Sequence, residues 1–128
     1  MFIQAHLAAG LVVGKLTGSY PAAIAGSVLL DLDHLVPYYR CRVIFNWRKL
    51  WRASTTTTHQ VLYTRNYLHS LFTWLLLSGA LFLFDPQLGI AFGAGYFSHL
   101  ILDSLDTAKY FPFFPSHWYF KGFVPYYS

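Results

Sequence analysis

The sequence contains no glutamate, and only 11% of its 128 residues are charged. Average globular proteins carry roughly 25% charged residues. A soluble helical domain of this length would therefore lack the usual means of keeping its outer faces hydrated. Because 55% of the residues are hydrophobic and 20% are aromatic, we expect lipid or a protein partner to cover much of the surface.

Cysteine is also nearly missing, since Cys41 is the single one. One cysteine excludes an intrachain disulfide and a CxxC metal motif. The N-terminal region has no positively charged stretch before its apolar run, so it predicts a retained helix and not a cleaved signal peptide. No linker-like stretch divides the chain, which predicts a single domain over residues 1–128.

Four apolar segments predict an all-α fold, a small and mostly apolar bundle of about four main helices. The segments cover about residues 3–17, 21–31, 67–84 and 86–106. The last two are each roughly 18–20 residues long, enough to cross a bilayer as helices. The first two are shorter and predict a hairpin that dips into the membrane or spans it obliquely. Their glycine and alanine content favours close helix packing.

The bundle is therefore predicted to be membrane-associated or multi-pass. A compact soluble bundle is the alternative, because a helix that is hydrophobic all round can also be a buried one.

The segment at about 36–66 is basic and aromatic. It holds six of the nine basic residues, interleaved with Trp47 and Trp51: Arg40, Arg42, Arg48, Lys49, Arg52 and Arg65. Basic residues with tryptophan and tyrosine are typical of the cytoplasmic headgroup level under the positive-inside rule. Nucleic acid is the competing partner for such a patch, but no recognisable binding motif supports it.

The five acidic residues are unevenly placed. Asp31 and Asp33 adjoin His34, and two more follow His99 in the stretch GYFSHLILDSLD, namely Asp103 and Asp106. The fifth precedes a proline, Asp85 before Pro86, which predicts a helix N-cap followed by proline at the first helical position. Most of the acids thus stand where metal or proton chemistry could occur.

Hairpin topology predicts that the polar groups converge. His6 begins the first segment and Asp31 ends the second, so both lie at one end of the first hairpin. His69 begins the third segment, while His99 and Asp103 lie toward the end of the fourth. The basic segment joins the two hairpins at that same side. The groups are therefore expected to meet at one membrane face, the basic and cytoplasmic one.

The pair His99 and Asp103 carries the sharpest metal signal. Positions i and i+4 lie one above the other on a helix, so both side chains point the same way. A histidine nitrogen and a carboxylate oxygen at this spacing suit Zn²⁺, which they bind at about 2.0–2.2 Å. Alone, the pair is weak evidence for metal, and a solvated helix end or a His–Asp hydrogen bond explains it better. Other polar groups are expected to converge on this pair, which favours a metal site. Ionisable groups in apolar helices are costly, so they are candidates for a functional role.

The other polar residues receive weaker assignments. Asp106 is expected in a second-shell or helix-end role, and His34 is expected to orient the turn that holds Asp31 and Asp33. His6 could instead be an interfacial residue, and His69 could simply be a polar residue at the start of a helix. The two histidines in loop and tail are not expected to be ligands: His59 and His117.

Four short motifs in a fixed order carry a resemblance. They are Ala5-His6 with Gly10, Gly26 with Asp31-Leu32-Asp33-His34, Arg65 with His69-Ser70, and Gly95-Tyr96 with Ser98-His99-Leu100, Asp103 and Thr107. In these motifs the chain resembles the family of inner-membrane-associated metal-dependent hydrolases, the YdjM-type family, also labelled LexA-binding. Three positions depart from the family pattern and affect turns more than ligands: Leu30, Asn66 and Leu68.

The motif order is also similar to that of the zinc-dependent phospholipase C and P1 nuclease fold. This resemblance implies that one ion is held by Asp31, His69, His99 and Asp103. It implies that His6 helps to hold a second ion, with Asp103 shared. The further glutamate ligand of that larger fold has no counterpart in a chain without glutamate.

The resemblance and the basic face together predict hydrolysis of a phosphoester by a zinc-activated water. Asp33 is the expected base or ligand-orienting carboxylate, and Arg65 is expected to bind the phosphate. A phospholipid headgroup is the expected substrate. The alternative is a noncatalytic membrane protein, a binding or stress-response partner with a structural metal site. A proton- or metal-handling protein would need polar groups on both sides, whereas these gather on one.

Overall fold

The computed structural model describes residues 3–34, 39, 42, 44–49, 67–107 and 109–124. Most of the basic segment 36–66, Arg65 included, lies outside these residues. So do the side chains of Asp33 and His34. The roles predicted for them therefore stay predictions.

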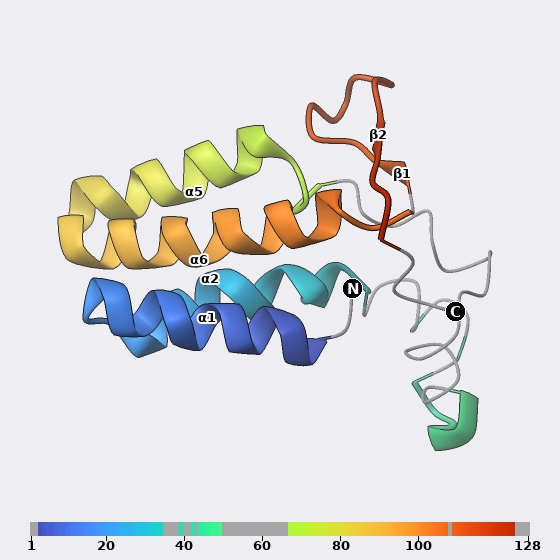
Figure 1. Cartoon of the computed structure of the whole chain (residues 1–128), viewed down its shortest axis with the longest axis horizontal. Helices are drawn as coiled ribbons and strands as arrows, with labels where there is room; N and C mark the ends of the chain where they lie inside the picture. Colours follow the sequence, from blue (N-terminus) through green and yellow to red (C-terminus); the bar gives the residue numbers. More distant parts are fainter. Residues whose placement is uncertain are drawn as a thin grey trace.

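Two antiparallel helical hairpins lie side by side in the described part of the chain (Figure 1). The first joins α1 (Ile3–Thr17) to α2 (Tyr20–Val28), which continues as the 3₁₀ helix η1 (Leu29–His34). The second joins α5 (Leu71–Phe84) to α6 (Pro86–Ser104). Helix α2 packs against both α1 and α6, and α5 packs against α6. The prediction of an all-α bundle with about four main helices is confirmed.

The start of each helix in the second hairpin follows from a capping residue. Asp85 accepts hydrogen bonds from the backbone N–H groups of Gln87 at 2.9 Å and Leu88 at 3.1 Å, with Pro86 at the first helical position. This confirms the predicted N-cap. Ser70 caps α5 in the same way by accepting from the N–H of Phe72 at 3.2 Å. The third apolar segment is therefore helical from residue 71, not from 67.

No helix in the described ranges is both long enough and apolar enough to cross a membrane. Helix α5 has 14 residues, about 21 Å of rise, against a hydrocarbon core of about 30 Å. Helix α6 has 19 residues, but its glycines, His99 and Asp103 lower its hydropathy. For the described residues, the prediction that segments 67–84 and 86–106 are spanning helices is wrong.

Helices α2 and α6 cross with their backbones in contact, as the predicted small-residue packing requires. A Cβ atom added at Gly26 would lie 2.1 Å from the carbonyl oxygen of Phe92. One added at Gly95 would lie 2.1 Å from the carbonyl oxygen of Ala23. Only glycine fits at either position, because neither neighbour is a side chain that can turn away.

The aromatic tail closes one end of the bundle. It forms an antiparallel pair of short strands, β1 (Lys109–Tyr110) and β2 (Phe120–Lys121), where a helix was not expected. The N–H of Gly122 donates to the carbonyl of Asp106 at 2.8 Å, and the N–H of Leu71 donates to the carbonyl of Pro112 at 2.8 Å. The tail thereby ties the end of α6 to the start of α5. The buried core lies at this end: Leu30, Tyr96, Leu100 and Tyr110.

Candidate metal centre

Five predicted ligand residues meet at one end of the bundle, where α1 and α5 begin and where η1 and α6 end (Figure 1). Their side chains form two overlapping groups with ligand atoms within 4.8 Å of one another. One group is His69, His99 and Asp103, and the other is His6, Asp31 and His99. The structure thus has the convergence that hairpin topology predicted.

The first group has the spacing of a tetrahedral metal site. The Nε2 atom of His99 lies 3.2 Å from that of His69 and 3.4 Å from Oδ2 of Asp103. The remaining edge, His69 Nε2 to Asp103 Oδ2, is 3.3 Å. Two ligands that each lie 2.0–2.1 Å from a zinc ion at the tetrahedral angle are about 3.3–3.4 Å apart. All three edges agree with this separation.

The tautomer of His99 is fixed by the backbone. Its Nδ1 atom lies 2.6 Å from the carbonyl oxygen of Ser27. A carbonyl only accepts hydrogen bonds, so Nδ1 carries the proton and donates it. In the neutral ring, Nε2 then presents its lone pair to His69 and Asp103. This second-shell arrangement is the one that metal-ligating histidines adopt in proteins.

This tautomer leaves two acceptors in contact, since the lone pair of His99 Nε2 faces an Asp103 carboxylate oxygen at 3.4 Å. Both groups are buried, with His99 at 0% and Asp103 at 1% exposure. Buried acceptors repel each other unless a cation lies between them. A proton on Nε2 or a metal ion supplies that cation. The donor set, two imidazoles and a carboxylate, is one that zinc binds.

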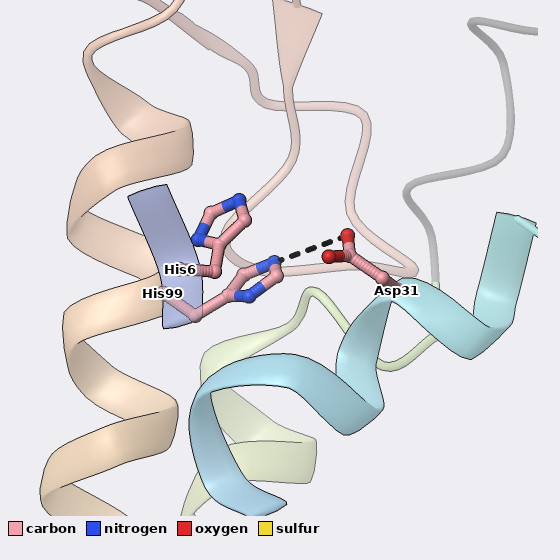
Figure 2. Close-up of side chains that lie close together, drawn as sticks. All are labelled: His6, Asp31 and His99. Atoms are coloured by element: carbon pink, nitrogen blue, oxygen red, sulfur yellow. Dashed lines mark ion pairs between the residues drawn. The ribbon is translucent and has the colours of Figure 1, made fainter. Parts of the chain in front are cut away.

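The second group is looser and shares an atom with the first. His6 Nε2 lies 3.5 Å from Oδ1 of Asp103, and Asp31 Oδ1 lies 3.9 Å from Nε2 of His99. Figure 2 shows His6 stacked on His99, with the Asp31 carboxylate facing a ring nitrogen of His99. Because an imidazole nitrogen has one lone pair, His99 Nε2 cannot serve separate ions in both groups. The geometry therefore fits one ion bound by His69, His99 and Asp103, with His6 or Asp31 completing the set.

His6 is fully buried, and neither of its ring nitrogens has a hydrogen-bond partner. Burial lowers the pKa of His6, and the nearby Asp103 carboxylate, 3.5 Å from Nε2, opposes that shift only in part. The lowered pKa keeps the ring neutral at pH 7, which is the form that can bind a metal.

Comparison with protein-family models matches residues 1–128 to a family described as YdjM inner membrane protein. The chain belongs to the YdjM inner membrane protein family. No curated protein and no solved structure matches the chain. The YdjM part of the resemblance is thereby confirmed, whereas its metal-dependent hydrolase part stays a prediction. The likeness to the phospholipase C and P1 nuclease fold stays a prediction.

Several features that hold this YdjM-family site in place were not predicted. The carbonyl of Ser27 orients His99, and the Tyr96 hydroxyl donates to the carbonyl of Leu68 beside His69. The Ser70 hydroxyl donates to the carbonyl of Phe114 at 3.3 Å, which fixes the turn that carries His69 to the tail. The family motifs contain Ser70 and Tyr96, but no sequence pattern indicates which backbone carbonyls they would contact.

Two further predicted assignments concern residues near the site. Asp106 is buried just beyond α6, and its backbone bridges to Val124 in the tail. It belongs to neither ligand group among the described residues, and its second-shell role stays a prediction. His117 is exposed in the tail, as expected for a histidine outside the site, whereas His59 lies outside the described residues.

We predict that the protein releases its metal as the pH falls from 7.5 to 5. Protons compete with the metal for each histidine nitrogen, so metal binding should weaken as the pH falls. The effect of His6 is smaller, because burial lowers its pKa. Metal content measured after dialysis at each pH tests this. Retention that is flat down to pH 5 would contradict histidine ligation.

Proposed function

We propose that this YdjM-family chain is a zinc-dependent hydrolase that cleaves a phosphoester bond in a phospholipid-like substrate. One observation carries the proposal. His69, His99 and Asp103 hold three ligand atoms 3.2–3.4 Å apart, and a backbone carbonyl fixes the one tautomer of His99 that can bind. A divalent ion bound there supplies Lewis-acid activation of a water molecule and of the phosphoryl group.

The residues of the chain divide this work by position. Asp103 lies at the centre, because its two oxygens are within 3.3–3.5 Å of Nε2 atoms from three histidines. His69 and His99 complete the tight group. Asp31 is the open edge, with 19% of its side chain exposed where the others are buried. A substrate and its water would approach along η1, where Asp31 can accept a proton. Asp33, two residues further on, remains the predicted base, and Arg65 the predicted phosphate ligand.

Burial favours one second candidate, a noncatalytic membrane protein with a structural metal. Structural zinc sites are closed, whereas catalytic sites keep an open position. His6, His69 and His99 are each 0% exposed, and Asp103 is 1% exposed. The partly exposed Asp31 is what favours catalysis over this alternative. The two candidates agree on metal binding and differ on turnover.

The test is hydrolysis of bis(p-nitrophenyl) phosphate by purified, zinc-loaded protein. We expect His99→Ala to lower kcat/KM by about 100-fold or more, since even second-shell changes at metal sites cost 10–100-fold. His117→Ala is the matched control, because it removes an exposed histidine that belongs to neither ligand group, and it should leave the rate unchanged.

Equal losses in both variants would overturn the proposal, as would a wild-type rate no higher than that of zinc alone. If the protein retains one tightly bound ion and hydrolyses neither this ester nor phospholipid, the structural-metal candidate replaces the hydrolase.

A further inference from the structure

The tail hairpin, residues 109–124, gathers exposed aromatic side chains at the metal-site end of the bundle. Five of them are 42–80% exposed: Phe113, Trp118, Tyr119, Phe120 and Phe123. The sequence from residue 107 to its last position contains no acidic residue. Tryptophan and tyrosine with this exposure are typical of the interface between membrane and water.

Two lysines stand opposite each other in this hairpin. The antiparallel register pairs Lys109 with Lys121 and Tyr110 with Phe120. Like charges directly opposite on paired strands are destabilising. Lys109 lies 4.7 Å above the ring of Tyr119, and no carboxylate of the described residues is in an ion pair with either lysine. The pair is therefore a concentrated positive charge that an external anion would stabilise.

The two faces of the hairpin differ in chemistry. Side chains alternate between faces along a strand, so both lysines lie on the face opposite Tyr110, which is buried in the core. On the Tyr110 side, a shallow apolar hollow of about 250 Å³ separates the hairpin from the end of α6. It is lined by Ser104, Tyr110, Pro112, Trp118 and Phe120. The lysines and the apolar hollow therefore lie on opposite faces of the hairpin, and the lysine face is the one that an anionic headgroup would contact.

We propose that the tail hairpin binds the headgroups of anionic lipids, with Lys109 and Lys121 on the phosphates and the exposed aromatic side chains among the lipids. Membership of an inner membrane protein family favours a lipid surface over nucleic acid as the source of those phosphates. This contact does not depend on hydrolysis or on metal.

Binding of the tail hairpin to lipid would also set the depth of the metal centre relative to the membrane surface. Backbone hydrogen bonds join the hairpin to both site-bearing elements, from Val124 to Leu105 after α6 at 2.9 Å and from Leu71 in α5 to Pro112 at 2.8 Å. Asp103 and His69 lie two residues away from these joints. A hairpin seated on the headgroups therefore holds the metal centre at the level of lipid phosphates.

The full-length protein, reconstituted in nanodiscs, tests the contact. One set contains phosphatidylcholine alone, and the other contains phosphatidylcholine with phosphatidylglycerol. A water-soluble acylating reagent labels exposed lysines, which peptide mass spectrometry then quantifies. We expect labelling of Lys109 and Lys121 to fall about fivefold in the anionic discs, the factor that one lysine contributes near a charged surface. High salt should reverse the protection. Lys15, exposed in the last turn of α1, serves as the internal reference.

Matched variants separate a specific contact from net charge. Lys121→Gln should weaken partition into phosphatidylglycerol vesicles about fivefold, and Lys121→Arg should restore it. Lys15→Gln changes the net charge equally and should have no effect. The Tm must be equal in all three, which shows that the fold is intact. Equal lysine labelling in both kinds of disc would overturn the proposal, as would equal losses for Lys121→Gln and Lys15→Gln. Stronger protection by a single-stranded oligonucleotide than by anionic lipid would also overturn it.

Discussion

Asp103→Asn should abolish metal binding while leaving the metal-free fold intact. Asparagine has nearly the same shape, but it lacks the charge that faces three histidine nitrogens at 3.3–3.5 Å. Losing a direct ligand should weaken binding by more than the 10–100-fold that a second-shell change costs. Zinc measured by mass spectrometry after purification without chelator should fall from about one ion per chain to near zero.

A second readout separates lost ligation from misfolding. A chelator should lower the Tm of the wild type, because an ion that binds only the native state stabilises it. The same chelator should leave the Tm of Asp103→Asn unchanged. Without metal, the variant should be at least as stable as the wild type, because the repulsion between Asp103 and the His99 lone pair is gone. A metal-free variant far less stable than metal-free wild type would contradict this.

Asp85→Asn is the matched control. Asp85 caps α6 at the opposite end of the bundle, and asparagine is an equally good N-cap. The variant should keep both its zinc and its Tm. If it loses zinc as Asp103→Asn does, the loss reflects total charge and not the site.

Gly95→Val should strongly destabilise the helical bundle. Its Cβ would meet the carbonyl oxygen of Ala23 at 2.1 Å, so α2 and α6 must separate. Overpacking of this kind typically costs 1–3 kcal/mol, and a clash with backbone belongs at about 3 kcal/mol or above. The free energy of unfolding in denaturant, measured in one detergent for all variants, tests the prediction.

Gly79→Ala controls for the general effect of replacing a helical glycine. A Cβ at Gly79 in α5 meets nothing within 4 Å. Alanine should therefore be neutral or stabilise the protein by about 0.5–1 kcal/mol, the usual gain in a helix interior. If Gly95→Val and Gly79→Ala change the free energy of unfolding by similar amounts, the backbones of α2 and α6 are not in tight contact.

Local sequence patterns were sufficient to predict the helices and much of the candidate site. The first helix lies over residues 3–17 as predicted, because a mostly apolar run and the turn glycine Gly18 define it. The meeting of His6, Asp31, His69, His99 and Asp103 followed from helix direction alone. The connections, two residues after α1 and one residue after α5, leave antiparallel packing as the only short path.

Long-range contacts account for what the sequence could not predict. The sequence of the third apolar segment predicts a helix from Tyr67, but the helix begins only after Ser70. Hydrogen bonds to the carbonyls of Pro112 and Phe114 in the tail hold the turn that precedes the helix. Likewise, the resemblance placed Asp31 with His69, whereas the structure places it nearer to His6 and His99. Side-chain grouping at this scale depends on the register of α2 against α6, which Gly26 and Gly95 set.

The spread of the ligands along the chain has a consequence for the order of folding. His6 stands near the first residue and Asp103 near the end of the last helix, so the cluster closes a loop of almost the full chain length. Such distant contacts form late, after their loop-closure entropy has been overcome. During synthesis, no partial chain that lacks α6 contains either His99 or Asp103. Metal capture should therefore be the final step of maturation, and bound metal would report that the whole bundle has assembled.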